Sequence, residues 1–341
     1  MASARPPLIA KLPLVVSLGD PCGIGPEIVA KAWRACREDP GLAFCVIGDV
    51  ETVAAQDVPV ARINEPGDAA GVFAKALPVL DRPLSEKAIP GQPDPVHAPH
   101  IIDWIRQGVA LCRAGQARGL VTAPIAKSIL YQSGFTFPGH TEFLAELCRE
   151  DGAAEARMPV MMLTARDLRV VLATIHVPLA NVPGSLSIAQ LVQLSRITRD
   201  ALVQDFAVAA PRLVMAGLNP HAGEDGTIGT EEMDILRPAV AALREAGVDI
   251  SGPFPADSLF HDDARARYDG VVCMYHDQGL IPLKTLDFWG GVNITLGLPI
   301  VRTSPDHGTG FDIAGKGVAC ADSFVNALKA ANQISRNRMR Q

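Results

Sequence analysis

Three histidines each follow a short apolar run of the kind that forms a buried strand. They are His176, His221 and His276, and the last of them follows residues 271–275. Because the carboxyl ends of parallel strands lie at one edge of a sheet, the three imidazoles could converge there. Three neutral histidines bind a divalent metal and leave positions open for a substrate, and imidazole favours zinc, cobalt or nickel over magnesium. An ordinary loop role for each histidine stays open at this point.

Three polar side chains interrupt the apolar segments that follow the third histidine. They are Lys284, Asn293 and Arg302. Burying a charge without a partner is costly, and an anionic ligand would supply one, with arginine gripping phosphate or carboxylate in a fork. Internal salt bridges are the equally open alternative. The nearby acids for such bridges are Asp269, Asp277 and Asp287.

A second set of anion-binding candidates lies at Gly139-His140-Thr141. His140 and Thr141 carry donors suited to phosphate or carboxylate, and Gly139 permits close approach of the backbone. Thr141 could instead cap a helix that continues through residue 147. Both interpretations hold together, because the N-terminus of a helix is itself an anion site.

A glycine-rich turn occupies residues 19–27, directly after the first apolar run. Pro26 suits the first turn of a following helix, and the glycines let backbone approach a ligand closely. Asp20, Gly23 and Gly25 are its candidate functional residues. The spacing is not G-x-G-x-x-G, so the usual dinucleotide fingerprint is absent, and a plain strand-to-helix turn stays open.

A second glycine-rich segment, residues 303–317, contains four glycines within ten residues, interleaved with Asp and His. Each glycine costs conformational entropy on folding, so this density indicates a loop that contacts a ligand. The loop leads into a final helix expected at residues 323–334.

The elements that must position these residues alternate along the chain between short apolar runs and helical patterns. Strands are expected at 14–18, 44–47, 119–122, 168–175, 212–217 and 271–274. Helices are expected at 28–36, 101–113, 188–206 and 231–246. This alternation predicts an α/β fold with a largely parallel sheet, whose ligands bind beyond the carboxyl ends of the strands.

Length and composition fit a soluble globular protein of two ordinary domains or one large one. The chain has 341 residues, of which 48% are hydrophobic and 20% charged, and its formal charge is −6. The absence of a basic block disfavours nucleic acid as a partner, and no apolar run is long enough to cross a membrane. Seven scattered cysteines without a C-x-x-C pair fit reduced thiols, so a cytoplasmic protein is expected.

On these motifs the sequence resembles the 4-hydroxythreonine-4-phosphate dehydrogenase family, from Gly19 to about Leu328. The motifs that carry the resemblance are GDPCGIGPE from residue 19, GHTEF from 139, NPHAGEDG from 219, YHDQGLIPLK from 275 and SPDHGT from 304. The first and last are also similar to motifs of the wider isocitrate and isopropylmalate dehydrogenase superfamily. That group binds NAD without the usual fingerprint.

The resemblance implies a two-domain α/β/α fold of the isocitrate and isopropylmalate dehydrogenase type, with largely parallel sheets and an active site in an interdomain cleft. The first domain would comprise residues 1–135 and 303–341, on the NAD side. The second would comprise residues 136–302, with the metal, the substrate and a homodimer interface. The active site would be shared across that interface.

The resemblance also assigns roles residue by residue. The metal ligands would be His176, His221 and His276, with His276 contributed across the dimer interface. The substrate-binding residues would be His140, Thr141, Lys284, Asn293 and Arg302. Near the adenine side of NAD would lie His307, Gly308, Thr309 and Asp312. Cys22 and Gly310 stand where the family usually has alanine, and neither touches a proposed ligand atom.

The activity implied is NAD-dependent oxidation and decarboxylation of 4-phosphohydroxy-L-threonine to 3-amino-2-oxopropyl phosphate, in pyridoxal 5'-phosphate biosynthesis. One divalent metal (zinc, cobalt or magnesium) and NAD, with NADP as the alternative, would be the cofactors. Relatives that oxidise 4-phospho-D-threonate or 4-phospho-D-erythronate keep the same motifs. A non-redox zinc hydrolase or aldolase is the alternative of another class, and the 306–317 loop argues against it.

Overall fold

The computed structural model describes residues 12–137, 139–149 and 158–340, which form two compact units. Unit 1 contains residues up to 149 together with 298–340, and unit 2 contains residues 158–297. The units therefore divide at different positions from those expected, since residues 139–149 and 298–302 belong to unit 1. The physical reason is packing, because the helix at 140–147 contacts the long helix at 98–113 and the strand at 302–305 joins the first sheet.

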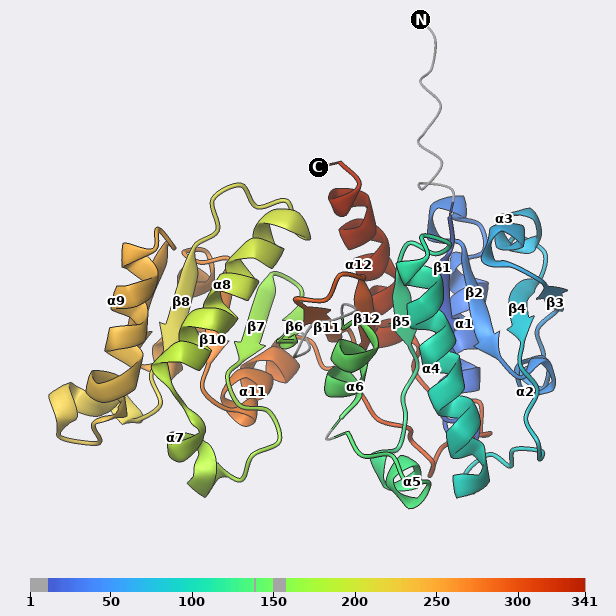
Figure 1. The fold of residues 1–341 in the computed structure, drawn as a ribbon, viewed down its shortest axis with the longest axis horizontal. Helices are drawn as coiled ribbons and strands as arrows, with labels where there is room; N and C mark the ends of the chain where they lie inside the picture. The colour runs from blue at the N-terminus through green and yellow to red at the C-terminus, as the bar shows by residue number, and fades with distance from the viewer. Residues whose placement is uncertain (1–11, 138, 150–157, 341) are drawn as a thin grey trace, which may run out of the picture. The chain divides into compact units, whose positions relative to one another are not determined.

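The strands of unit 1 form a parallel sheet in the order β3-β4-β2-β1-β5-β12 (Figure 1). Their bounds are β1 Leu14–Ser17, β2 Phe44–Gly48, β3 Val60–Ile63, β4 Leu77–Asp81, β5 Leu120–Thr122 and β12 Arg302–Pro305. Every pairing among them is parallel. The sequences of β1, β2, β4 and β5 are almost entirely buried and mostly apolar, as is typical of strands covered on both faces, whereas the edge strand β3 is partly exposed.

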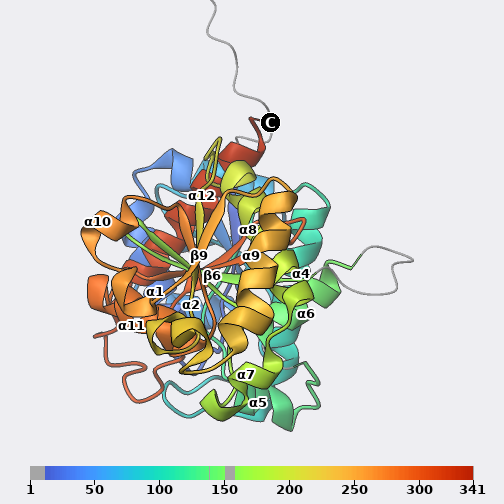
Figure 2. The same cartoon turned by 90° about the vertical axis from the view of Figure 1, so that its left-hand side faces the viewer.

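Helices cover both faces of this sheet, with α1 and α12 on one side and α4 and α6 on the other (Figure 2). The helices are α1 Gly25–Cys36, α2 Val50–Ala54, α3 Ala69–Val72, α4 Ala98–Arg113, α5 Lys127–Gln132, α6 His140–Leu147 and α12 Asp322–Arg338. Short 3₁₀ turns are η2 Pro40–Leu42, η3 Pro66–Asp68 and η4 Pro95–His97. In α4, Ile101, Trp104, Ile105 and Val109 recur at helical spacing and are all buried.

The strands of unit 2 follow the order β11-β6-β7-β10-β8-β9. Their bounds are β6 Val160–Ala165, β7 Leu168–Leu172, β8 Leu213–Ala216, β9 Ile250–Phe254, β10 Gly270–Cys273 and β11 Val292–Leu296. The pairings of β7, β10, β8 and β9 are parallel, whereas β6 pairs antiparallel with both β7 and β11. The largely parallel α/β fold predicted from the sequence is confirmed, with this antiparallel edge as an addition.

The helices of unit 2 again cover both faces, α8 and α9 on one and α10 and α11 on the other (Figure 2). They are α7 Val182–Ser185, α8 Ile188–Gln204, α9 Arg237–Glu245, α10 Asp262–Arg265 and α11 His276–Leu286. Shorter segments are η5 Leu179–Asn181, η6 Pro220–Gly226, the π-helical η7 Glu232–Leu236 and η8 Ala256–Ser258. The single helix expected at 231–246 is thus a π-helical turn followed by α9.

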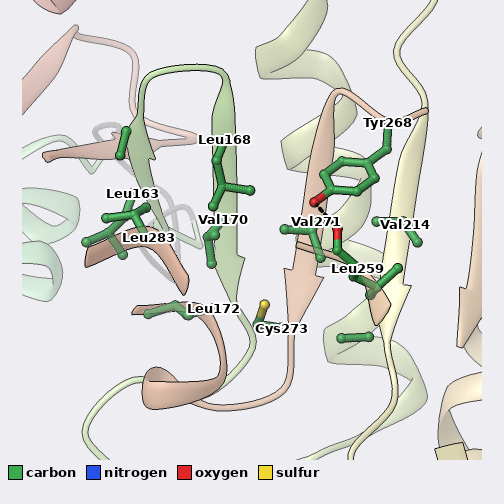
Figure 3. Packing of buried hydrophobic residues seen from close by; sticks show 12 residues of the cluster. Leu163, Leu168, Val170, Leu172, Val214, Leu259, Tyr268, Val271, Cys273 and Leu283 are labelled. Atoms are coloured by element: carbon green, nitrogen blue, oxygen red, sulfur yellow. Dashed lines mark hydrogen bonds between the residues drawn. The ribbon is translucent and has the colours of Figure 1, made fainter. Parts of the chain in front are cut away.

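The core of unit 2 anchors the elements that carry the histidines (Figure 3). Val170 and Leu172 of β7 pack with Val271 and Cys273 of β10, and Leu283 fixes α11 against them. Tyr268 is buried in the same cluster, and its hydroxyl donates a hydrogen bond of 2.9 Å to the carbonyl of Leu259. Among the residues described, no helix is both long and apolar enough to cross a membrane.

Candidate functional site

The three histidines follow three neighbouring parallel strands of unit 2. Strand β10 pairs with β7 on one side and with β8 on the other. His176 comes after β7, His276 after β10 and His221 after β8. All three therefore leave the same edge of one parallel sheet, where α/β proteins bind their ligands.

Two of the imidazoles face one another at a spacing that suits a shared metal ion. The ring centres of His176 and His276 are 5.9 Å apart, with an angle of 36° between the planes. Two histidines on one tetrahedral zinc, at a bond length of about 2.1 Å, have ring centres roughly 5 to 6 Å apart. No group of three metal ligands gathers within the described part of the chain.

A carboxylate fixes which nitrogen of His276 can bind a metal. The Nδ1 atom of His276 lies 2.7 Å from Oδ1 of Asp277. Since an ionised carboxylate only accepts hydrogen bonds, Nδ1 carries the proton and the lone pair is on Nε2. Metal-binding histidines commonly have such a carboxylate on the opposite nitrogen. The sequence offered Asp277 only as an acid for a salt bridge and missed this role.

Gln278 ties the ends of two of these strands together, and the sequence analysis missed it. Its Nε2 donates to the carbonyl of Gly217 after β8, and its Oε1 accepts from the N–H of Met274 after β10, both at 2.7 Å. Gln278 is buried. These bonds fix the turn before His276 relative to the end of β8. The sequence feature that could have indicated this role is that Gln278 lies two residues after His276, in the segment HDQG.

Arg302 lies in a buried polar cluster of unit 1, at the strand pair β5–β12. Its Nη2 donates to the hydroxyl of Thr122 at 2.8 Å and to Nδ1 of His140 at 3.3 Å. These two partners are neutral, so burial is not offset by them, and it lowers the pKa of Arg302 to about 10. A buried guanidinium is suited to binding an anionic ligand.

The contact with Arg302 also defines the form of His140. A guanidinium has only donors, so Nδ1 of His140 accepts and the proton is on Nε2. Burial, together with the charges of Arg302 and Lys127, holds the pKa of His140 well below its usual value. The Nε2 atom is buried and has no hydrogen-bond partner among the described residues. His140 is thus a neutral donor available to an anion, while Thr122 and Lys127 are neighbours that sequence analysis missed.

Thr141 does not cap the helix, contrary to one of the expected interpretations. Helix α6 begins at His140, its N-cap is Gly139, and no side chain caps it. A Cβ on Gly139 would lie 2.8 Å from Oε2 of Glu142 and 3.3 Å from Nζ of Lys127. The glycine therefore lets Lys127 approach the amino end of α6. Both candidate residues of this motif lie in the first turn of that helix.

Lys284 and Asn293 are both in unit 2, on α11 and β11. The Nζ of Lys284 lies 5.3 Å from the ring centre of Phe288. The Oδ1 of Asn293 is buried, without a hydrogen-bond partner among the residues described. The acids considered as alternative partners bond elsewhere: Asp269 to Arg212, Asp277 to His276 and Asp287 to the N–H of Gly290.

Packing explains the glycines of the first turn. A Cβ on Gly23 would lie 2.8 Å from the carbonyl oxygen of Thr309, and one on Gly25 would lie 2.5 Å from that of Leu18. The N–H of Ile24 donates to the same Thr309 carbonyl at 2.8 Å, so the turn is joined to the 306–317 loop. Asp20 is fully buried beside it, and burial raises its pKa to about 6.

The other cofactor candidates are in that loop of unit 1. His307 and Thr309 are half-buried, whereas Gly308 and Asp312 are exposed. Beside the first turn lies a cavity of about 770 Å³, lined by Gly23 and by Gly315 of the loop. Its polar lining residues include Glu27, Asp49, Glu51, Glu86 and Lys87. The volume accommodates a nucleoside, and carboxylates suit its hydroxyl and amino donors rather than phosphates.

The fold is that of an α/β protein in which three histidines follow the carboxyl ends of neighbouring parallel strands. Residues 42–331 match the family described as "Pyridoxal phosphate biosynthetic protein PdxA". A Caulobacter vibrioides protein named 4-hydroxythreonine-4-phosphate dehydrogenase is 58% identical over 328 residues, covering 96% of this chain and 98% of the relative. A relative of the same name from Xanthobacter autotrophicus is 52% identical over 334 residues, covering 96% and 95%.

Solved structures similar to this chain bear the same enzyme name as these relatives. The crystal structure of the Klebsiella pneumoniae enzyme of that name has a TM-score of 0.82 at 36% identity, covering 95% of this chain and 98% of that one. The chain therefore belongs to the PdxA family of pyridoxal phosphate biosynthesis. The resemblance stated from the motifs is confirmed.

Proposed function

We propose that this protein catalyses NAD-dependent oxidation and decarboxylation of 4-phosphohydroxy-L-threonine to 3-amino-2-oxopropyl phosphate. The observation that carries the proposal is the set of three histidines leaving neighbouring strands β7, β10 and β8, with Nδ1 of His276 held by Asp277. The names of the relatives, at up to 58% identity, support this substrate. The reaction oxidises the C3 hydroxyl, and the resulting β-keto acid loses CO₂.

The histidines fit a divalent metal by their donor chemistry and by the spacing of two of them. His176, His221 and His276 would hold it, and nitrogen donors favour zinc or cobalt over magnesium. When bound, such an ion supplies Lewis acidity that lowers the pKa of a substrate hydroxyl. Asp277 keeps His276 in the required tautomer, and Gln278 keeps its turn in place.

The cationic residues would hold the anionic ends of the substrate. Arg302, neutral His140 and the first turn of α6 offer a buried set of donors for phosphate or carboxylate. Lys284 and Asn293 would bind a second polar group of the substrate. These residues orient the substrate so that hydride can leave C3.

NAD, with NADP as the alternative, would be bound by unit 1. His307, Gly308, Thr309 and Asp312 are the residues we assign to its adenine side, beside the turn that contains Asp20, Gly23 and Gly25. The nicotinamide supplies the hydride acceptor.

A direct test is the absorbance of NADH with the metal-loaded protein, NAD and 4-phosphohydroxy-L-threonine, before and after EDTA. We expect NADH to form and chelation to abolish its formation. Signal with 4-phospho-D-threonate or 4-phospho-D-erythronate alone would assign a different substrate. No signal with any of the three would overturn the redox function and favour a non-redox zinc enzyme.

We also propose a homodimer whose partner completes the metal site. Apolar side chains on and after α11 support it, since Ile281, Phe288 and Trp289 are 65%, 61% and 61% exposed. The rings of Phe288 and Trp289 contact each other edge to face, at 5.1 Å between centres. Ile281 is on the helix that begins with His276, and Phe288 and Trp289 follow its end, so a second subunit covering this apolar surface would also reach the surroundings of His276.

Replacing Ile281 with glutamate should convert the dimer to monomers and reduce activity. A charge in the centre of a buried apolar interface is strongly unfavourable, which predicts at least about a hundredfold weaker dimerisation. Light scattering after size-exclusion chromatography measures the mass. Val318→Glu is the matched control, because Val318 is equally exposed, at 65%, but lies in unit 1. A dimer that persists in the Ile281 variant would contradict this interface.

Cysteine chemistry supports a reducing compartment, and we propose the cytoplasm. All seven cysteines are free. Burial raises the pKa of Cys45 to about 12, so this thiol stays protonated and unreactive at neutral pH.

A further inference from the structure

The segment that carries His221 has an unusual backbone. Five consecutive residues of η6 adopt positive φ: His221 55°, Ala222 53°, Gly223 77°, Glu224 42° and Asp225 51°. Four of the five are not glycine. L-residues disfavour this region because Cβ approaches the following carbonyl, and left-handed stretches longer than a single residue are rare. Contacts from outside the segment must therefore stabilise this conformation.

The side chain of Glu232 supplies those contacts. Its Oε1 accepts hydrogen bonds from the backbone N–H groups of Leu218 and Asn219, both at 2.7 Å, and its Oε2 accepts from Nδ2 of Asn219 at 2.9 Å. Glu232 is 1% exposed, and these three donors are neutral. A buried carboxylate is retained only where hydrogen bonds offset its desolvation, so the geometry of the donors is tightly constrained.

Two glycines of the turn, Gly217 and Gly223, let the backbone approach the carboxylate of Glu232 closely. A Cβ on Gly223 would lie 2.6 Å from Oε2 of Glu232, and one on Gly217 would lie 3.3 Å from Oε1. The carboxylate thus lies against both ends of the turn, before and after His221. Glu232 itself is the first residue of the π-helical segment η7, a geometry that is often found at functional sites.

We propose that Glu232 is the positioning residue for His221: its carboxylate binds the backbone of residues 218–219 and so holds the left-handed turn that presents the imidazole. The inference rests on the proposed function in taking His221 as a metal ligand. Glu232 acts through the backbone and does not itself bind the metal. Loss of an outer residue that orients a metal ligand typically weakens metal binding by about 10- to 100-fold.

The test compares Glu232→Gln with the full-length wild type. Glutamine keeps the size of the side chain and an oxygen for the backbone N–H groups of Leu218 and Asn219, but that oxygen carries no charge and accepts more weakly. Its N–H₂ group replaces the oxygen that accepts from Nδ2 of Asn219, so that two donors face each other there. We expect the affinity of the EDTA-treated protein for Co²⁺, followed by visible absorption, to fall about 10- to 100-fold. We also expect faster hydrogen exchange at the amides of Leu218 and Asn219.

The neighbouring residue provides the matched control. Glu231 also accepts from Nδ2 of Asn219, at 2.7 Å, but binds neither backbone N–H. Glu231→Gln should therefore keep the wild-type Co²⁺ affinity and exchange rates. Glu232→Asp, with a shorter carboxylate, should fall between Glu232→Gln and the wild type.

The outcomes separate this inference from the proposed function. If wild-type protein binds Co²⁺ and Glu232→Gln binds it equally well with unchanged amide exchange, the positioning role is wrong. If wild-type protein binds no Co²⁺, the metal site is wrong, and exchange at residues 218–219 still decides whether Glu232 holds the turn. Should Glu232→Gln fail to fold, the same two measurements on Glu232→Asp decide, with unchanged affinity and exchange again refuting the proposal.

Discussion

Replacement of His221 with alanine should reduce kcat by at least about a thousandfold. A catalytic metal site with three protein ligands that loses one of them holds its metal weakly and in the wrong geometry. The candidate cofactor residues are in unit 1, whereas His221 is in unit 2, so NAD affinity should change less than about twofold. Initial rates of NADH formation, bound metal per subunit and NAD titration by calorimetry measure the three quantities.

An exposed histidine of the same unit is the control for this variant. His261 precedes α10 and is exposed, and no role is proposed for it. His261→Ala should keep wild-type activity and metal content. Near-normal turnover of His221→Ala, with metal retained, would refute the assignment of His221 as a ligand. Loss of NAD binding together with turnover would point instead to a general loss of structure.

Replacement of Arg302 with methionine should lower kcat/KM by about 10²- to 10³-fold. Removing one member of a buried, hydrogen-bonded charged contact costs about 2–5 kcal/mol, and each 1.4 kcal/mol is a factor of ten. Two changes combine, because the cation is lost and Nδ1 of His140 loses its donor. The imidazole can then place its proton on either nitrogen, so Nε2 is no longer fixed as a donor to the anion.

Steady-state kinetics with saturating NAD test this prediction, with Arg169→Met as the control. Arg169 is also partly buried, it donates to the carbonyl of Asp269 in unit 2, and no substrate contact is proposed for it. Arg169→Met should lower the free energy of unfolding but leave kcat/KM nearly unchanged. Arg302→Met with unchanged kcat/KM would show that the substrate anion binds elsewhere.

The sequence predicted the fold class because parallel strands buried on both faces appear as continuous apolar runs, as in β1 and β10. It missed the hairpin β6–β7 for the same reason. Residues 160–172 are apolar throughout apart from the polar residues near the turn, so no alternation marks two antiparallel strands. The boundaries between the units could be placed only approximately, because no linker composition marks them.

For the candidate site, the sequence identified individual candidate residues but not the residues that contact them in the folded chain. The placement of His176, His221 and His276 after strands was readable, but the insertion of β10 between β7 and β8 was not. Arg302 and Thr122 are 180 positions apart, and their contact depends on the pairing of β5 with β12. Glu232 gave no signal, since a single buried glutamate resembles any other acid in a helix.

The chain leaves unit 1 and returns to it only at residue 298, and this order has a consequence for synthesis on the ribosome. Unit 2 is continuous in sequence, so a nascent chain contains all of it before β12 has been made. The sheet of unit 1 lacks strand β12 until roughly the last forty residues emerge, and helix α12 cannot pack against that strand before then. Arg302 arrives with that final stretch. Nascent or prematurely terminated chains can therefore complete the histidine-bearing unit, but they lack the buried cation that we assign to the substrate.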